Sequence, residues 1–317
     1  MRYFIAIDSG GTKTDSVLFD ETGHIIKRSL THGCNSMDIG VENAKSHLLS
    51  VIRDLTNSIP NKERLTALYS GVAATDYYNG ELGKYVQSFY PGIPMRFEDD
   101  AVNLISGTVG HINACAIVCG TGSSLYARID GKIIHLGGWG YLIDTGGSGY
   151  SLGRDALYES FRYCDGRGPK TLMYDLIKDK MGISPENNIP GIYSGGRPYI
   201  ASLANVVFQA RKMGDSIAER VFQKNVNSLA ELTFAVEKWF DSSCYKCVLG
   251  GGIFSAFPEY ADELKRQCSP FAELIRASVP PILGGVIEAL YDGGIKCTDD
   301  IRKRFLEEYS FLAAKKE

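Results

Sequence analysis

The chain has 317 residues, of which 44% are hydrophobic and 22% charged, and its formal net charge is −3. This length suggests two domains that each bury a core, and no basic cluster predicts a nucleic-acid surface. No apolar run approaches the roughly 20 residues that a membrane-spanning helix needs, so we expect no membrane partner.

The N-terminus and the cysteines indicate the cellular compartment in which we expect the protein. The predicted first strand begins at Tyr3, so we expect no signal peptide ahead of the fold. The eight cysteines are dispersed and lie mostly in apolar stretches, which favours reduced thiols in the cytoplasm. The pair Cys244 and Cys247 lacks the second pair or nearby histidine of a zinc site, so we interpret both thiols as core residues.

The first glycine-rich stretch, residues 8–14, lies between predicted strands over 3–7 and 15–19. Glycines let backbone amides crowd around an anion, and the carboxylate of Asp8 suits a Mg²⁺ ion held through water. The stretch also fits a plain hairpin turn in which the two glycines supply positive φ, and it lacks the spacing of a Walker loop. Its candidate phosphate-binding residues are Gly10, Gly11, Thr12 and Lys13.

Strands and helices alternate through the rest of the first half. We expect strands over 24–29, 65–70 and 95–98 and helices over 41–55, 81–89 and 101–106. This order is typical of an α/β domain with a mixed sheet.

A second glycine-rich loop opens the second half. Residues 114–119 and 125–129 predict strands that flank the loop at 120–124. Two such hairpins, about 110 residues apart, suggest a duplicated unit whose copies face one ligand. The candidate phosphate-binding residues here are Gly120, Thr121, Gly122 and Ser123.

The remaining elements follow in order. A strand over 131–136 precedes a glycine-rich loop at 137–149 and a mostly helical insertion at 151–241, whose strongest helix patterns cover 199–213 and 218–240. The last predicted elements are a strand at 246–249 that runs into Gly250-Gly251-Gly252, a helix at 260–267, a strand at 274–277, a helix after the loop at 281–285 and a helix at 301–314.

With both glycine loops in view, the chain resembles the sugar kinase, hsp70 and actin superfamily. More narrowly, it resembles the BadF/BadG/BcrA/BcrD ATPase family, which includes N-acetylglucosamine and N-acetylmuramic acid kinases, from the first loop to Gly285. The resemblance implies two ribonuclease H-like domains with mixed sheets and an interdomain cleft for ATP and Mg²⁺. We expect them at 1–111, joined by the C-terminal helix at 299–317, and at 112–298, with a hinge at 108–113.

Two further stretches gain roles from the resemblance. The glycines at 250–252 resemble the family's adenosine site, although a tight strand-to-helix turn also explains them. The segment from Gly137 to Ile143 resembles the sugar-kinase signature, in which Gly138 and Trp139 lie at the sugar. Trp139 also fits a core aromatic that covers the sheet.

The chain departs from the family directly after this signature. Many relatives continue with Gly-Asp-Glu-Gly-Ser, whose Asp touches the sugar, whereas this chain has Asp144-Thr145-Gly146-Gly147-Ser148. Thr145 takes the place of that Asp, and Gly146 takes the place of the Glu. Asp144 lies one position early and is a candidate to contact the sugar in its stead after a local shift. Asn35 matches a substrate-binding Asn of the N-acetylglucosamine kinases, although a loop Asn is often a turn former.

The predicted catalytic base is Asp100. A carboxylate beside a sugar hydroxyl can accept its proton as the phosphoryl group arrives. In the family, the base directly precedes two small or apolar residues that open a helix, and Asp100-Ala101-Val102 matches this pattern better than Asp99 does. Asp100 is also the natural N-cap of the helix that begins at Ala101.

The favoured function is ATP-dependent phosphorylation of a sugar hydroxyl, with an amino sugar such as N-acetylglucosamine as substrate and a homodimer as the assembly. One alternative in the family is an ATPase activator of a radical dehydratase, which holds an iron–sulfur cluster through cysteines. Its cluster cysteine lies in Cys-Ala-Ala-Gly-Thr-Gly, whereas Cys119 directly precedes Gly120 here. A non-catalytic nucleotide or sugar sensor is the other alternative, suggested by Thr145 and Gly146.

Overall fold

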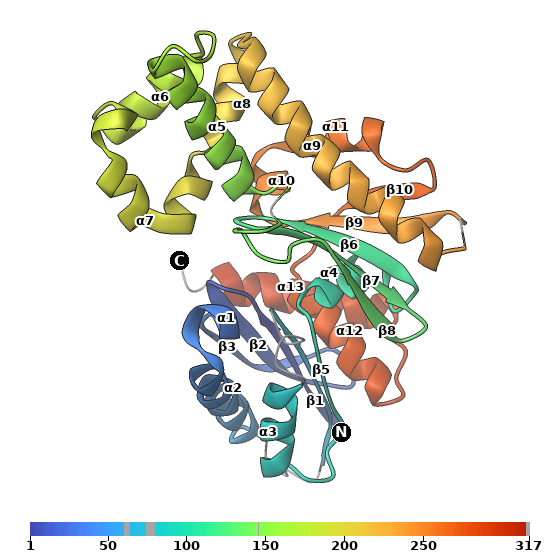
Figure 1. Ribbon diagram of the computed structural model, residues 1–317. Helices are drawn as coiled ribbons and strands as arrows, with labels where there is room; N and C mark the ends of the chain where they lie inside the picture. Colours follow the sequence, from blue (N-terminus) through green and yellow to red (C-terminus); the bar gives the residue numbers. More distant parts are fainter. Residues whose placement is uncertain (60–63, 74–79, 145, 242, 315–317) are drawn as a thin grey trace. The chain divides into compact units, whose positions relative to one another are not determined.

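The computed structural model divides into two compact units, each with its own sheet (Figure 1). Each unit also has its own hydrophobic core. Unit 1 comprises Met1–Ile112 and Ala277–Glu317, and unit 2 comprises Asn113–Arg276. No helix within the described ranges is long and apolar enough to cross a bilayer. The structure describes residues 1–59, 64–73, 80–144, 146–241 and 243–314.

The sheet of unit 1 has the strand order β3-β2-β1-β4-β5. The first three strands are antiparallel neighbours, whereas β4 and β5 continue the sheet parallel to β1. Every residue of β1 is buried, which explains its unbroken apolar run, because a strand covered on both faces has no polar side to alternate with. The strands are β1 (Tyr3–Ser9), β2 (Lys13–Asp20), β3 (Ile25–His32), β4 (Leu65–Val72) and β5 (Met95–Glu98).

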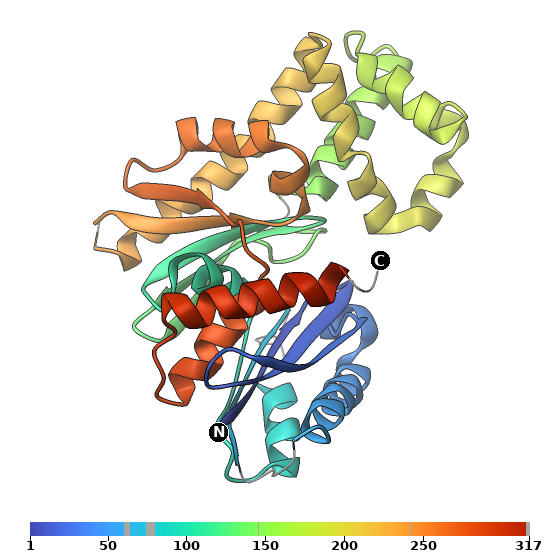
Figure 2. The ribbon, with the colours of Figure 1, turned by 180° about the vertical axis from the view of Figure 1, so that it is seen from behind.

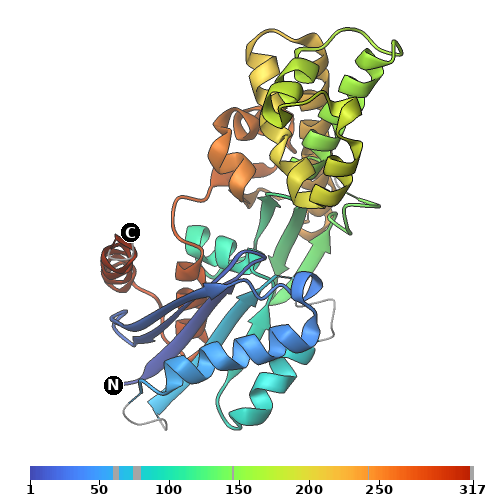
Figure 3. The ribbon, with the colours of Figure 1, turned by 90° about the vertical axis from the view of Figure 1, so that its left-hand side faces the viewer.

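Helices cover both faces of this sheet (Figure 3). The apolar side of α2, which includes Leu48, Ile52 and Leu55, is buried in the core of unit 1. On the other face, α12 contacts β1, β4 and α4. The helices of unit 1 are α1 (Ser36–Ile39), α2 (Val41–Thr56), α3 (Glu81–Phe89), α4 (Ala101–Val109), α12 (Ile282–Asp292) and α13 (Asp299–Ala314).

The C-terminal helix α13 packs on β2 and β3 (Figure 2). Phe305 is fully buried, with its ring centroid 6.3 Å from that of Phe19. The hydroxyl of Tyr309 donates to Asp15 Oδ2 at 2.6 Å, and this carboxylate also pairs with Arg28 at 2.7 Å. These buried contacts tie α13 to unit 1.

Helix α12 differs from our expectation in two ways. We expected residues 281–285 to form a loop, but the helix begins at Ile282 and contains Gly284 and Gly285. These glycines allow a close approach, because a Cβ on Gly284 would collide with the backbone of Asn103 in α4. We also expected residues 277–298 in the second domain, whereas their contacts place them in unit 1.

Unit 2 repeats the sheet of unit 1, with the order β10-β9-β6-β7-β8. Again three antiparallel strands, β6, β7 and β8, are extended by two parallel ones, β9 and β10. The expected α/β class and duplicated unit are therefore confirmed. The strands are β6 (Ala114–Cys119), β7 (Ser123–Ile129), β8 (Lys132–Leu136), β9 (Tyr245–Gly250) and β10 (Ala272–Arg276).

The insertion between β8 and β9 is helical, as expected. The two predicted helices differ from the observed ones at their ends. The pattern over 199–213 spans the break between α7 and α8 at Leu203, and the pattern over 218–240 corresponds to α9, which begins at Ser216 and ends at Val236. The helices of unit 2 are α5 (Gly149–Cys164), α6 (Leu172–Met181), α7 (Ile189–Ser202), α8 (Ala204–Lys212), α9 (Ser216–Val236), α10 (Gly252–Ala256) and α11 (Pro258–Gln267).

Candidate functional site

The first glycine loop is a tight turn between β1 and β2. Gly10 N donates to Lys13 O at 3.1 Å, and the hydroxyls of Ser9 and Thr14 hydrogen bond at 2.7 Å. The chain is thus a hairpin here, but neither Gly10 nor Gly11 has a positive φ. Packing at this turn requires a glycine at position 33 instead, because a Cβ on Gly33 would collide with the backbone of Gly10 and Gly11.

Carboxylates lie beside this turn. Asp100 Oδ2 is 3.5 Å from the position that a Cβ on Gly10 would take, and Asp38 Oδ2 is 3.1 Å from the equivalent position on Gly11. Asp100 is partly exposed, whereas Asp99 is buried. Asp100 therefore presents its carboxylate beside the turn.

The capping role expected of Asp100 falls to its neighbour. Asp100 occupies the N-cap position of α4, but the amide of Ala101 donates to Asp99 Oδ1 at 3.1 Å. The two carboxylates thus have different surroundings: Asp99 supports the helix, and Asp100 remains beside the glycine turn.

Asp8 is held by a buried side chain that the sequence analysis missed. Asn103 in α4 is fully buried, and its Nδ2 donates to Asp8 Oδ1 at 2.7 Å and to Ile7 O at 3.3 Å. Within the described part of the chain, the Oδ1 of Asn103 has no hydrogen-bond partner. An Asn in the apolar run 101–105 was the available signal, because an amide at a core position needs a polar partner.

The carboxylates of unit 1 perturb one another. Burial raises the pKa of Asp8 from 3.8 to about 6, although the hydrogen bond from Asn103 and the charge of Lys13 oppose the rise. Burial raises the pKa of Asp100 well above its ordinary value, and the charges of Asp99 and Asp8 raise it further. A cation or a proton would relieve this repulsion.

These residues fit a hydrated Mg²⁺ ion better than a protein-enclosed one. Within the described ranges, no three His, Cys, Asp or Glu side chains gather into a metal-binding group. Mg²⁺ commonly keeps several waters and takes only one or two carboxylates together with substrate phosphates. Asp8, with its raised pKa and one oxygen engaged by Asn103, suits such a site.

Asn35 forms the turn that a loop Asn often forms. Its Oδ1 accepts from Met37 N at 2.9 Å and caps the short helix α1. The amide of the preceding Cys34 donates to Gly10 O at 3.2 Å, so Asn35 directly follows a segment that packs on the first glycine turn. Asn35 and the turn thus lie in the same part of unit 1.

The second glycine loop is tied to the N-terminus of α5. Gly120 N donates to Gly122 O, and Gly120 O in turn accepts from Gly149 N, both at 2.8 Å. Thr121 is exposed, but Ser123 is buried and its hydroxyl donates to Gly146 O at 2.5 Å. The hydroxyl of Ser123 is thus engaged within the protein.

The third glycine stretch meets the second loop in unit 2. Gly250 ends β9 and Gly252 begins α10, so a tight strand-to-helix turn is present. Gly251 has a φ of 101°, and a Cβ there would collide with the backbone of Cys119, the residue before the second loop.

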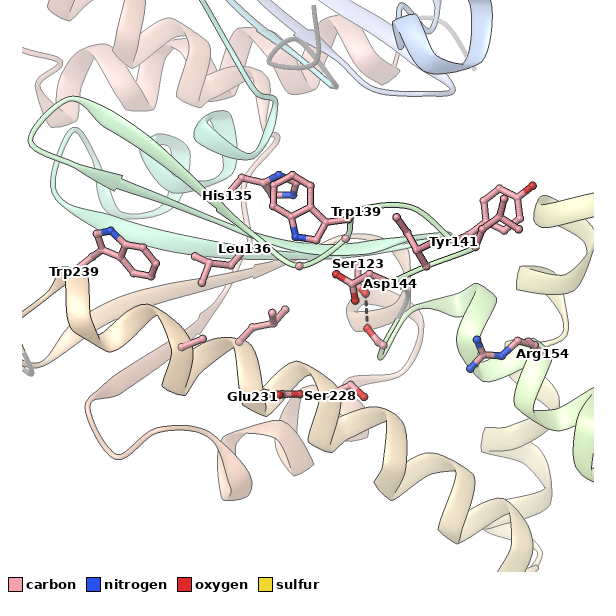
Figure 4. A pocket seen from close by; sticks show the side chains of 17 residues that line it. Ser123, His135, Leu136, Trp139, Tyr141, Asp144, Arg154, Ser228, Glu231 and Trp239 are labelled. Carbon is pink, nitrogen blue, oxygen red and sulfur yellow. Dashed lines mark hydrogen bonds between the residues drawn. The ribbon is translucent and has the colours of Figure 1, made fainter.

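A cavity of about 650 Å³ lies between the loop that begins at Gly137 and helix α9 (Figure 4). Trp139 is 55% exposed and lies 4.5 Å from the ring of His135, so it is not the buried core aromatic we considered. Asp144 lines the same cavity, and its amide donates to Gly140 O at 2.8 Å. Thr145 lies outside the described residues. The cavity also has Gly138, Arg154, Ser228, Glu231 and Trp239 in its walls.

The structure therefore groups the predicted residues within each unit. In unit 1, Asp8, Asp100 and Asn35 lie near the turn that begins at Gly10. In unit 2, the second loop meets the glycines at 250–252 and the start of α5, whereas Trp139 and Asp144 line the cavity.

Two curated kinases are similar to this chain over most of its length. The chain is 27% identical over 314 residues to the N-acetyl-D-glucosamine kinase of Dictyostelium discoideum, covering 90% of this chain and 97% of the relative. It is 27% identical over 302 residues to the N-acetylmuramic acid/N-acetylglucosamine kinase of Clostridium acetobutylicum, covering 91% and 98%.

A solved structure shares the fold. A proposed N-acetylglucosamine kinase from Chromobacterium violaceum superposes with a TM-score of 0.69 and 21% identity, covering 90% of this chain and 98% of that one. The model of the BadF/BadG/BcrA/BcrD ATPase family matches residues 5–289. This chain therefore belongs to the BadF/BadG/BcrA/BcrD ATPase family.

Proposed function

We propose that this protein is an ATP-dependent kinase that phosphorylates a hydroxyl of an amino sugar such as N-acetylglucosamine. The carrying observation is the carboxylate of Asp100 beside a glycine turn, in a chain whose second sheet repeats the same glycine hairpin. The names of the two kinases at 27% identity support the substrate class.

Asp100 is the proposed general base. A sugar hydroxyl is a poor nucleophile until its proton leaves, and a carboxylate within reach accepts that proton as the phosphoryl group arrives. A raised pKa makes Asp100 a stronger base than an ordinary carboxylate, provided that it is ionised. The proton is held at the carboxylate until the phosphorylated sugar leaves.

Backbone amides of the two loops are the proposed phosphate ligands. Gly11, Thr12 and Lys13 would contribute from unit 1, and Thr121 and Gly122 from unit 2. Gly10 and Gly120 would line the phosphates while their own amides close the two turns, and the buried hydroxyl of Ser123 fixes its loop. When bound at Asp8, Mg²⁺ supplies charge neutralisation to the nucleotide phosphates. The glycines at 250–252 would lie against the adenosine.

The sugar is proposed to contact Asn35 in unit 1 and Gly138, Trp139 and Asp144 in unit 2. The half-exposed ring of Trp139 offers an apolar face for a sugar ring, and Asp144 offers an acceptor for its hydroxyls. Thr145 is also proposed to contact the sugar, on the basis of its position in the sequence alone.

The radical-dehydratase activator is less well supported. Cys119 is fully buried, and its thiol donates to Gly147 O at 3.2 Å. Burial also raises the pKa of this thiol far above its ordinary value, whereas a cluster ligand must be a thiolate. Cys119 thus serves the core of unit 2.

The test is ADP release by the purified protein with Mg²⁺-ATP and one sugar at a time: N-acetylglucosamine, N-acetylmuramate, glucosamine or glucose. We expect an amino sugar to stimulate release most strongly. ATP binding without stimulation by any sugar would favour the sensor alternative and contradict the kinase proposal.

A further inference from the structure

The helix α7 brings an arginine to the second glycine loop. Gly196 lies inside α7 with φ 58° and ψ −153°, values that interrupt the helix just before Arg197 and Pro198. Beyond this kink, α7 packs closely on α5, because a Cβ on Gly153 would collide with the backbone of Ile200. The position of Arg197 is therefore fixed by the packing of two helices.

The guanidinium of Arg197 lies against the backbone of the loop. Its Nη2 is 2.7 Å from the position that a Cβ on Gly122 would take, so the glycine leaves the space that the guanidinium fills. The Nε of Arg197 is buried and has no hydrogen-bond partner among the residues that the structure describes. A buried donor without an acceptor costs free energy, which a bound anion would recover.

The surroundings favour an anion at this place. A small hollow is lined by Arg197 and by Thr121, Gly122 and Ser148. Ser148 is the N-cap of α5, a helix of 16 residues whose dipole places partial positive charge at this end. The amides of Gly149, Tyr150 and Ser151 are already engaged within the protein. The guanidinium of Arg197, the positive end of the α5 dipole and the backbone of the glycine loop thus meet at one hollow.

We propose that Arg197 binds a phosphate group of the nucleotide at the loop formed by Gly120, Thr121 and Gly122. This inference rests on the proposed ATP-dependent function. A guanidinium presents paired N–H donors that match phosphate oxygens and keeps its charge at any physiological pH. Arg197 thereby adds the fixed positive charge that the loop itself lacks.

Two neighbours offer Arg197 a purely structural role. The ring of Tyr141 has its centroid 5.6 Å from the guanidinium carbon, and the carboxylate of Asp144 lines the same hollow. If Arg197 only packs on these side chains, its removal will disturb the loop for every ligand alike. A ligand without phosphate therefore separates the two roles.

The experiment measures the Kd of ADP and of adenosine by calorimetry for the full chain and its variants. We expect R197M to weaken ADP binding by about 10- to 100-fold, the usual effect of losing a charge-assisted hydrogen bond, and to leave adenosine binding unchanged. R197K should recover part of the loss. The matched control is R220M, which removes an exposed arginine of α9 that pairs with Glu159, and it should bind ADP normally.

A second variant tests the contact itself. The added methyl of G122A would push the flexible guanidinium aside, so G122A should weaken ADP binding in the wild-type background but have little further effect beside R197M. Unchanged ADP affinity in R197M, or equal losses for ADP and adenosine, would overturn the role of Arg197. Failure of the wild-type protein to bind ADP would instead overturn the proposed function, and this inference with it.

Discussion

At the scale of single residues, two adjacent carboxylates have separate tasks. Asp99 is buried and accepts the first free amide of α4, while Asp100 is partly exposed beside Gly10. From the sequence, Asp100 could be chosen over Asp99 as the catalytic base only by a family pattern. Two adjacent carboxylates before a helix cannot be told apart until the directions of their side chains are known.

This division predicts opposite effects of two substitutions. Asp100→Asn should lower kcat by roughly 10²-fold or more, because an amide cannot accept the hydroxyl proton. It should not lower the melting temperature at neutral pH, because burial and the charges of Asp99 and Asp8 raise the pKa of Asp100, so that loss of its charge relieves repulsion. Asp99→Ala should instead cost about 1 kcal/mol of stability through the lost cap. Steady-state kinetics and thermal melts on both variants make the comparison. Normal turnover in Asp100→Asn would exclude it as the base.

Asp8 predicts a pH dependence of stability. Burial raises its pKa from 3.8 to about 6, so the folded chain binds this proton more tightly than the unfolded chain does. The ionised carboxylate therefore destabilises the folded state. The fold has its full stability below about pH 4, where Asp8 is protonated in both states, and it loses stability as the pH rises through about 6. Asp8→Asn should be more stable than the wild type at pH 7, and the difference should shrink at pH 5.

The measurement is urea unfolding at both pH values without Mg²⁺ or nucleotide. The gain at pH 7 should be on the order of 1–3 kcal/mol, since one pKa unit corresponds to about 1.4 kcal/mol. Asp175→Asn, at an exposed position of α6, is the control and should follow the wild type. Identical pH profiles for Asp8→Asn and the wild type would show that Asp8 carries no such cost.

At the scale of elements, the strands were the more predictable part. The apolar runs before both glycine loops became β1 and β6, because glycines ended each run sharply. Helix α12 was harder, since its two glycines are typical of a loop. Their reason is the crossing with α4 at Asn103, a contact about 180 residues apart in the chain that no local pattern encodes.

The candidate site shows the same limit. Glycine loops and the acidic pair could be found in the sequence because their chemistry is contiguous. Asn103 and Arg197 could not be assigned a role, because each meets its loop only through tertiary packing: Asn103 through the passage of α4 beside β1, and Arg197 through the kink of α7 against α5. Side chains that support a loop from a distant helix therefore need the structure.

At the scale of the whole molecule, the two units have separate cores and separate chain connectivity. Unit 2 is one continuous segment, whereas unit 1 is completed by residues that follow unit 2 in the chain. Domains with their own cores often unfold as separate cooperative units. Trp139 and Trp239, the two tryptophans of the chain, both lie in unit 2, so their fluorescence reports on that unit.

A matched pair of core substitutions tests this independence. Phe305 in α13 and Phe222 in α9 are both fully buried, one in each unit, and each Phe→Ala change should cost about 3–5 kcal/mol. Phe222→Ala should shift the tryptophan fluorescence transition in urea to lower concentration. Phe305→Ala should leave that transition in place and shift part of the far-ultraviolet circular dichroism signal, because it weakens only the packing of α13 on unit 1. If both variants shift the fluorescence transition equally, the two units unfold as one cooperative body, and the separate cores do not act as separate folding units.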